Sequence, residues 1–404
     1  MSIDEGSVEA GWGEEALIAT RRHLHRNPEL SGAEHETARY VAERLGELGL
    51  EAELGAHGAP TGVVAVIEGA HPGPTLAWRA DTDALPIHEE SGAEYASCRP
   101  GVMHACGHDV HTTIGLGIAS RLVASRERLR GRVKMIFQPE EEGVPGDRVA
   151  GAEAMAQAGV LDSPKVDAIF AAHCMPSIPV GRIGYRHTAM WAGSDHWRLV
   201  IRGRQSHGAY PQDGVDPIWI AGQIIVALQG IPARVIDSRR CCVLSVGKVE
   251  AGEAFNVIPE TVTLVGLLRT LEDDVRERAV AALRQTVDGI CQAWGARAEL
   301  NISRGAEVTA NDPALVERAL ATLRGQVGAE RLAEVEPQMG AEDFASFSRR
   351  RPAAYFLLGV GNEARGIVHP IHSPRFDVDE RCLPFAVQAF SGMLLDLAED
   401  WPGA

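Results

Sequence analysis

Short apolar runs rich in β-branched and aromatic residues recur in the first and last parts of the chain and predict buried strands. These runs lie at residues 61–67, 75–79, 131–137, 166–172 and 353–358. Apolar positions repeat with helical spacing in other segments, and these predict helices at residues 34–48, 112–125 and 311–325. The alternation of strands with helices predicts an α/β domain whose central sheet is mostly parallel and flanked by helices.

The middle of the chain has a different pattern. It predicts four strands, at residues 197–201, 242–249, 261–268 and 298–302. It also predicts two helices, at residues 216–228 and 271–294. This pattern is typical of a small α+β domain. We therefore expect a catalytic domain formed by residues 1–186 and 304–404, with a lid or dimerisation domain inserted at 187–303.

Polar side chains follow three of the predicted strands directly. Asp81 and Asp83 follow the strand at 75–79, Glu141 and Glu142 follow the next strand, and His173 follows the strand at 166–172. Ligands of open α/β sheets bind beyond the carboxyl ends of the strands. The sequence therefore predicts a functional site at this edge of the sheet.

The run from His104 to His111 places a thiol, a carboxylate and three imidazoles within eight residues. Borderline-soft divalent metals prefer these groups as ligands. The histidines could also serve only to hydrogen-bond a loop, with Cys106 as a small buried filler. Further imidazoles at His173 and His372, together with the glutamates after residue 139, favour the metal interpretation.

Composition narrows the class of protein. The 404 residues carry a formal net charge of −16, which disfavours binding to nucleic-acid phosphates. The first residues lack a basic start followed by an apolar core, and we expect no stretch long enough to span a bilayer. Seven irregularly spaced cysteines suit a reducing compartment, so we expect a cytoplasmic protein.

Six motifs occur in order over nearly the whole chain. They are RADTDALP at 79–86, MHACGHDVH at 103–111, FQPEEEG at 137–143, AFNVIP at 254–259, MGAEDF at 339–344 and HSP at 372–374. Together they resemble the co-catalytic metallopeptidase family of aminoacylases and zinc carboxypeptidases. More narrowly, the chain resembles the amidohydrolase branch, which contains hippurate hydrolases, auxin-conjugate hydrolases and N-acyl-amino-acid amidohydrolases.

The resemblance implies two divalent metal ions per subunit and a catalytic base. It assigns Glu141 as the base. It assigns as metal ligands Cys106, His108, Glu142, His173 and His372. Zinc or manganese suits this ligand set best, although cobalt and nickel are compatible with it. A thiolate at Cys106 could bridge two ions about 3.5–4 Å apart.

The sequence specifies the roles of the residues around the ligands less closely. Asp81 and Asp109 could orient ligand imidazoles, but loop hydrogen bonding explains them equally well. Glu140 departs from the small residue usual in the family, and we expect its side chain to be solvated. His104 and His369 are expected to be structural.

In the inserted domain, the segment around His207 resembles the lid histidine motif of the family, with Ser206 as a mild departure. The resemblance implies that His207 reaches the scissile carbonyl, commonly across a dimer interface, and stabilises the oxyanion. Asn256 and Arg269 similarly resemble lid groups that bind a substrate carboxylate. A homodimer or higher homo-oligomer is implied on the same ground.

These observations predict a metal-dependent amidohydrolase that cleaves N-acyl amino acids into a carboxylic acid and a free amino acid. A metallo-carboxypeptidase or dipeptidase acting on short peptides is an alternative within the hydrolases. A sensor that binds acyl-amino acids without catalysis is an alternative of another class. In a third alternative, Cys106 and His108 form a nucleophile and base pair, which sensitivity to chelators would distinguish.

Overall fold

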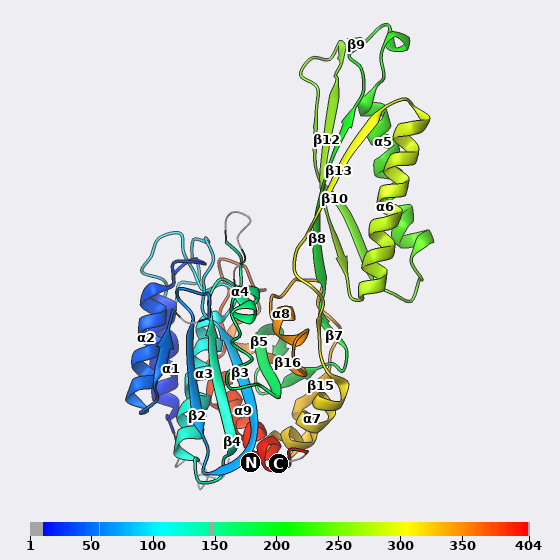
Figure 1. The fold of residues 1–404 in the computed structure, drawn as a ribbon. Helices are drawn as coiled ribbons and strands as arrows, with labels where there is room; N and C mark the ends of the chain where they lie inside the picture. The colour runs from blue at the N-terminus through cyan, green and yellow to red at the C-terminus, as the bar shows by residue number, and fades with distance from the viewer. Residues whose placement is uncertain (1–10, 56, 145–148, 150, 403–404) are drawn as a thin grey trace. The chain divides into compact units, whose positions relative to one another are not determined.

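The computed structural model describes residues 11–55, 57–144, 149 and 151–402. The chain forms two compact units. Unit 1 contains the described residues up to Thr188, then residues Ala310–Glu336, and the chain from Ser346 onward. Unit 2 contains Ala189–Thr309 and Pro337–Ala345. Each unit is drawn in Figure 1.

Unit 1 is built on an eight-stranded sheet with the order β1-β2-β4-β3-β5-β16-β6-β15. The strands are β1 Ala52–Leu54, β2 Val63–Glu68, β3 His71–Asp81, β4 Arg130–Gln138, β5 Ala168–Pro179, β6 Ile183–Tyr185, β15 Leu332–Glu334 and β16 Ala353–Gly361. The central pairs β4–β3, β3–β5 and β5–β16 are parallel, whereas β1–β2, β2–β4 and β16–β6 are antiparallel. The predicted strands therefore form the mostly parallel centre of the sheet.

The helices of unit 1 are α1 Glu14–Arg26, α2 His35–Glu47, α3 His108–Ala124, α4 Gly151–Gln157, α7 Pro313–Val327 and α9 Cys382–Glu399. Helix α3 packs against β3 and α9, and α9 also packs against β3 and β4. Trp78 of β3 meets Phe390 of α9 with ring centroids 4.8 Å apart. Both side chains are within the buried core of this unit. Helices thus flank the sheet as expected (Figure 1).

Unit 2 has a four-stranded antiparallel sheet with the order β10-β12-β8-β13. Its strands are β8 Gly193–Arg202, β10 Cys242–Ala251, β12 Thr261–Thr270 and β13 Arg297–Arg304. Helices α5 Pro217–Leu228 and α6 Asp273–Ala293 pack on β12, β8 and β13 (Figure 1). Helix α5 begins where Asp216 accepts hydrogen bonds from the N–H groups of Ile218 and Trp219, with Pro217 in the first turn.

The remaining short elements lie in the loops and connections. They are β7 Ala189–Trp191, β9 Ser206–His207, β11 Val257–Ile258, β14 Thr309–Ala310, α8 Ala345–Ser348, and the turns η2 Pro211–Asp213, η3 Ile231–Val235, η4 Ala329–Arg331 and η5 Glu363–Arg365. The segment 337–345 joins unit 2 because the N–H of Ala192 bonds the carbonyls of Gln338 and Gly340.

The predicted fold class is confirmed, and two sequence expectations are corrected. Helix α3 begins at His108 rather than at residue 112, because the helical turn includes the histidine cluster itself. The stretch Pro217–Val235 is long and apolar enough to cross a bilayer by length and composition, contrary to expectation. One face of this stretch, including Ile220 and Ile224, belongs to the core of unit 2.

Candidate metal centre

Gly107 sets the position of the ligand cluster at the start of α3. It is the residue before the helix and has φ +88°, in the left-handed region that favours glycine. A Cβ at this position would lie 3.0 Å from Cys174 Cβ and 3.1 Å from its Sγ. Only glycine can therefore make this turn so close to β5. The turn brings Cys106 and His108, on either side of it, to the carboxyl end of the sheet.

His108 is fully buried and its two ring nitrogens have different surroundings. Nδ1 lies 3.2 Å from Asp83 Oδ1. Nε2 has no hydrogen-bond partner among the described residues, yet it lies 3.7 Å from Asp81 Oδ2 and 3.9 Å from Glu141 Oε2. Burial opposes a charged ring, but Asp81 and Cys106 raise the pKa of His108 well above its usual value. The surroundings of Nε2 thus favour a cation.

His173 presents its Nε2 to the thiol of Cys106. The His173 Nδ1 lies 2.7 Å from the Cys174 carbonyl oxygen, an acceptor that fixes the proton of the neutral ring on Nδ1. Burial lowers the pKa of His173 well below its usual value, so the ring is neutral, as a metal ligand must be. Its Nε2 lies 3.4 Å from Cys106 Sγ.

His372 and Glu142 approach Cys106 from another side. His372 Nε2 lies 3.3 Å from Cys106 Sγ and 3.4 Å from Glu142 Oε1. That Glu142 oxygen is buried and has no hydrogen-bond partner among the described residues. Glu141, whose side chain is 10 % exposed, has its Oε2 3.9 Å from His108 Nε2, and Glu142 Oε1 lies 4.0 Å from the same nitrogen. Both glutamates can face His108 because they lie in the turn after β4 rather than within the strand, where neighbouring side chains point to opposite faces.

Two groups of ligand atoms share the Cys106 sulfur. Cys106, His108 and His173 form one group, and Cys106, Glu142 and His372 form the other, with all atoms of a group within 4.8 Å of one another. His108 Nε2 and Glu142 Oε1 are possible metal-ligand atoms that make no hydrogen bond among the described residues. A thiolate, imidazoles and a carboxylate also match the ligand preferences of divalent transition metals. The residues therefore fit a centre of two metal ions, which Cys106, His108, Glu142, His173 and His372 would hold.

His111 belongs to the sequence cluster but is hydrogen-bonded at both ring nitrogens. Its Nδ1 lies 2.5 Å from Asp81 Oδ1, and its Nε2 accepts the N–H of Cys174 at 2.8 Å. No lone pair remains for a metal. Burial would raise the pKa of Asp81, but Arg79, His108 and His111 lower it well below its usual value. Asp81 is therefore an ionised group that neutralises positive charge at the site.

Asp109 and His104 are buried next to the ligand cluster, and the contacts of Asp109 are with helix α1. Asp109 Oδ2 accepts a hydrogen bond from Arg21 Nε at 2.8 Å and lies 2.8 Å from His25 Nδ1. It contacts these α1 groups and not a ligand imidazole, so the suggested orienting role passes to Asp83. Neither nitrogen of buried His104 has a hydrogen-bond partner among the described residues, and burial lowers the pKa of His104 to about 4.

Glu140 is buried, with 3 % of its surface exposed, contrary to the expected solvated side chain. Its φ of +64° turns the chain sharply after β4, and its Oε2 accepts the N–H of Gly151 at 3.2 Å. Glu34, which the sequence marked only as the first residue of a predicted helix, accepts the N–H of Glu140 at 3.0 Å. The acidic turn that contains Glu140 is thus hydrogen-bonded to Glu34, just before α2, and to Gly151, the first residue of α4.

The residues predicted in the inserted domain fall in two places within unit 2. His207 of β9 pairs with Val257 of β11, next to Asn256, whose carbonyl accepts the N–H of Gly208. Arg269 lies near the other end of β12, eight residues from Thr261, or about 26 Å at ~3.3 Å per residue. Unit 2 therefore brings His207 and Asn256 together and holds Arg269 apart from them.

His207 and Arg269 each have a side-chain nitrogen that could bind a substrate group. The N–H of Ala209 bonds His207 Nδ1 at 3.0 Å, which leaves the proton on the exposed ring's Nε2. Arg269 Nη1 is buried without a hydrogen-bond partner among the described residues. Burial lowers the pKa of Arg269. A guanidinium in this condition favours an anionic partner.

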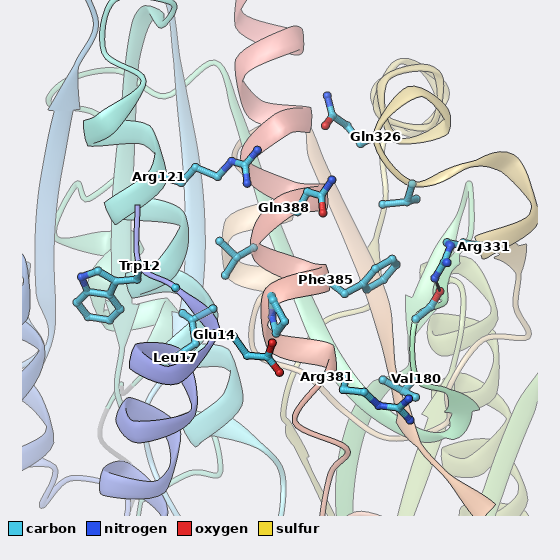
Figure 2. Close-up of a pocket in the computed structure, with 15 residues that line it drawn as sticks. Trp12, Glu14, Leu17, Arg121, Val180, Gln326, Arg331, Arg381, Phe385 and Gln388 are labelled. Atoms are coloured by element: carbon cyan, nitrogen blue, oxygen red, sulfur yellow. Dashed lines mark hydrogen bonds between the residues drawn. The ribbon is translucent and has the colours of Figure 1, made fainter. Parts of the chain in front are cut away.

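A cavity of about 660 Å³ in unit 1 is separate from the ligand cluster (Figure 2). It is lined from α1, α3, α7, η4 and α9 by residues that include Leu17, Arg121, Gln326, Arg331 and Phe385. Among the described residues, the lining includes no predicted ligand or base. The candidate metal centre is therefore defined by its ligand geometry rather than by this cavity.

Comparison with known proteins agrees with the geometry. Residues 77–396 match the model of peptidase family M20/M25/M40. The chain is 39 % identical over 377 residues to thermostable carboxypeptidase 2 of Saccharolobus solfataricus, covering 93 % of this chain and 94 % of that protein. It is 37 % identical over 373 residues to the N-acetyl-L-cysteine deacetylase of Bacillus subtilis, covering 92 % and 85 %.

A solved structure shares the whole fold. The YXEP protein of Bacillus subtilis, described as a dinuclear metal-binding peptidase of the M20 family, superposes with a TM-score of 0.84 and 35 % identity, covering 96 % of this chain and 98 % of that chain. The resemblance read from the motifs is confirmed, as is the expectation of an enzyme acting on amide bonds. The chain belongs to peptidase family M20/M25/M40.

Proposed function

We propose that this enzyme is an amidohydrolase that cleaves N-acyl amino acids to a carboxylic acid and a free amino acid. The observation that carries the proposal is the pair of ligand groups sharing Cys106, with the Glu141 carboxylate 3.9 Å from His108 Nε2. Similarity to a deacetylase of an N-acetyl amino acid supports this substrate class.

In this proposal two divalent ions are held by Cys106, His108, Glu142, His173 and His372. Zinc or manganese is the favoured metal, with cobalt and nickel compatible. When bound, such ions polarise a carbonyl and lower the pKa of water. A nucleophilic role for Cys106 is disfavoured, because burial raises the pKa of this thiol well above its usual value, whereas a nucleophilic cysteine needs a lowered pKa.

Glu141 is the general base and then the general acid. Its carboxylate takes a proton from the attacking water as the new C–O bond forms at the amide carbon. It then returns the proton to the nitrogen as the C–N bond breaks, which releases a neutral amine. Its position beside the ligands, rather than among the buried orienting groups, gives its oxygen access to the reacting water.

The unit 2 groups bind and polarise the substrate. The His207 Nε2–H donates to the carbonyl oxygen as negative charge develops there. Asn256 and Arg269 bind the carboxylate of the amino-acid half, with Arg269 supplying the charge.

We further propose a homodimer. Arg269 lies about 26 Å along β12, at ~3.3 Å per residue, from Thr261, the end of the strand that β9 and β11 adjoin, so His207 and Arg269 act on one small substrate from different subunits in this proposal. Helix α5 exposes Ile218, Trp219 and Val226, an apolar face suited to an interface. Mixing inactive His207→Ala and Arg269→Ala subunits should restore part of the activity, because one of the two composite sites is then intact. Activity no higher than that of either variant alone would contradict this arrangement.

A carboxypeptidase or dipeptidase activity is the second candidate, favoured by similarity to thermostable carboxypeptidase 2. The test is amino-acid release from acetyl-, benzoyl-, long-chain-acyl- and aminoacyl-amino acids, using metal-stripped protein with and without zinc or manganese. Metal-dependent release from the acyl series supports the amidohydrolase, whereas a preference for aminoacyl substrates supports the peptidase. Turnover that is indifferent to metal would overturn the proposed metal centre.

We assign the enzyme to the cytoplasm. All seven cysteines are free thiols, and they occur in both units. This state suits a reducing compartment.

A further inference from the structure

Glu34 links the start of α2 to the acidic turn, 106 residues away in sequence. The residue is fully buried and immediately precedes α2, but its side chain does not cap that helix. Instead, Oε1 accepts the N–H of Gly32 at 2.8 Å and that of Glu140 at 3.0 Å, while Oε2 accepts the Thr61 hydroxyl at 2.8 Å. One carboxylate thus connects three segments of unit 1.

The turn that Glu34 contacts is conformationally unfavourable. Glu140 has φ +64°, and the left-handed region is destabilising for a residue with a Cβ. Such a conformation persists where surrounding contacts hold it. On the far side of Glu141, the Glu142 N–H donates to Asp83 at 2.9 Å. The backbone on both sides of the proposed base is therefore bonded to a buried carboxylate.

Burial and the nearby Asp83 carboxylate raise the pKa of Glu34 to about 7. Placing an ionisable group here is therefore unfavourable for folding, although its three donors offset part of that cost. Glu29, also buried in the connection between α1 and α2, provides a contrast. Its carboxylate bonds the Thr37 N–H and hydroxyl and pairs with Arg99, with none of these contacts in the acidic turn.

We infer that Glu34 is a positioning residue for Glu141: its carboxylate fixes the Glu140 backbone, and the Glu140 turn sets where the base stands. This inference rests on the proposed role of Glu141. It assigns Glu34 no contact with substrate or metal. Loss of the contact would let the turn relax from its left-handed conformation, and the base would move relative to the ligands while the ligands themselves stayed in place.

The test compares Glu34→Ala, Glu34→Asp and Glu34→Gln with Glu29→Ala in the full-length protein. Hydrogen exchange at the Glu140 amide is measured on metal-stripped protein, and kcat, KM and metal content on reloaded protein. Glu34→Asp retains the charge but is one methylene too short to reach the turn, so it tests the contact even if Glu34→Ala fails to fold. Glu34→Gln keeps an acceptor oxygen for the Glu140 N–H.

We expect Glu34→Ala and Glu34→Asp to speed exchange at Glu140 at least ~10-fold and to lower kcat about 10- to 100-fold, with KM and metal content nearly unchanged, because small displacements of a catalytic group have effects of this size. Glu34→Gln should recover most of both properties, and Glu29→Ala should leave both unchanged. Unaltered exchange at Glu140 in Glu34→Asp, or an equal fall in kcat in Glu29→Ala, would overturn the inference. Hydrogen exchange at Glu140 can be measured even if no substrate is turned over, so failure of the proposed function can be distinguished from failure of this inference.

Discussion

Asp83 Oδ1 lies 3.2 Å from Nδ1 of His108, and this contact directs the other imidazole nitrogen toward the ligand cluster. The second oxygen of Asp83 accepts the N–H of Glu142. A single buried carboxylate therefore orients both an imidazole and a glutamate of the proposed ligand set. Asp83 is itself ionised, since the hydrogen bond and charge of His108 outweigh burial and lower the pKa of Asp83.

Asp83→Asn should weaken metal binding about 10- to 100-fold, the usual effect of losing a group that orients a ligand. The amide nitrogen would face either the His108 N–H or the Glu142 N–H, and both are donors. Competition with a chromophoric chelator measures the affinity. Ser31→Ala is the control, because it removes only the Ser31 hydroxyl bond to Asp83. Equal affinities for Asp83→Asn and the wild type would contradict the orienting role.

Cys106→Ala should reduce the bound metal from two ions to one or none, because the sulfur belongs to both ligand groups. Cys106→Asp, which restores an anionic bridging ligand, should retain more metal than the alanine variant. Metal analysis by mass spectrometry after gel filtration provides the measurement. Two ions retained by Cys106→Ala would show that the thiol is not a shared ligand.

Gly107→Ala should destabilise the protein more than Gly49→Ala and should also lower metal affinity. Both glycines have positive φ, so each alanine loses roughly 1–2 kcal/mol of stability in the left-handed region. Only at Gly107 does the added Cβ also meet Cys174. Urea unfolding and chelator competition would measure the two effects. Equal losses of stability would mean that the close approach to β5 is unimportant.

Arg21→Met should lower the free energy of unfolding by about 3–5 kcal/mol, because it leaves the buried Asp109 carboxylate without its guanidinium. Arg22→Met is the matched control on the same helix. Its half-exposed pair with Glu380 should contribute less than ~1 kcal/mol. Urea unfolding of metal-stripped protein would compare the two variants, and a similar small loss in both would refute the prediction.

The Asp109 cluster should also make stability fall in acid. Burial would raise the pKa of Asp109, but Arg21 and His25 lower it far below the unfolded value of about 3.9. The unfolded chain therefore binds a proton first, so the stabilisation is present above about pH 4 and is lost as pH falls further. Unfolding measured between pH 7 and pH 3 should show a shallower fall in Arg21→Met than in the wild type. Parallel curves would contradict this linkage.

Local pattern predicted the fold class and the main strands and helices of unit 2, but in unit 1 it did not predict helices α1 and α9 or strands β1, β6 and β15. Continuous apolar runs located β2, β3, β4, β5 and β16, because strands that are buried on both faces are apolar at successive positions. Helix boundaries were less well predicted. Helix α3 starts at His108, within the histidine cluster, and the polar residues of that cluster do not show the apolar spacing from which the helix was predicted.

The ordered motifs of the sequence determined the family. The location of the site was also predictable, because the polar residues that directly follow parallel strands meet at one edge of the sheet. The tertiary structure alone decided which groups keep a free lone pair. Residue type and spacing alone do not separate His108 from His111, but Asp81 and the Cys174 N–H occupy both nitrogens of His111. Glu140 is buried rather than solvated because Glu34, more than a hundred residues earlier, bonds its backbone. Spacing along a chain specifies chemistry, whereas hydrogen bonds between distant segments decide which of those groups remain available.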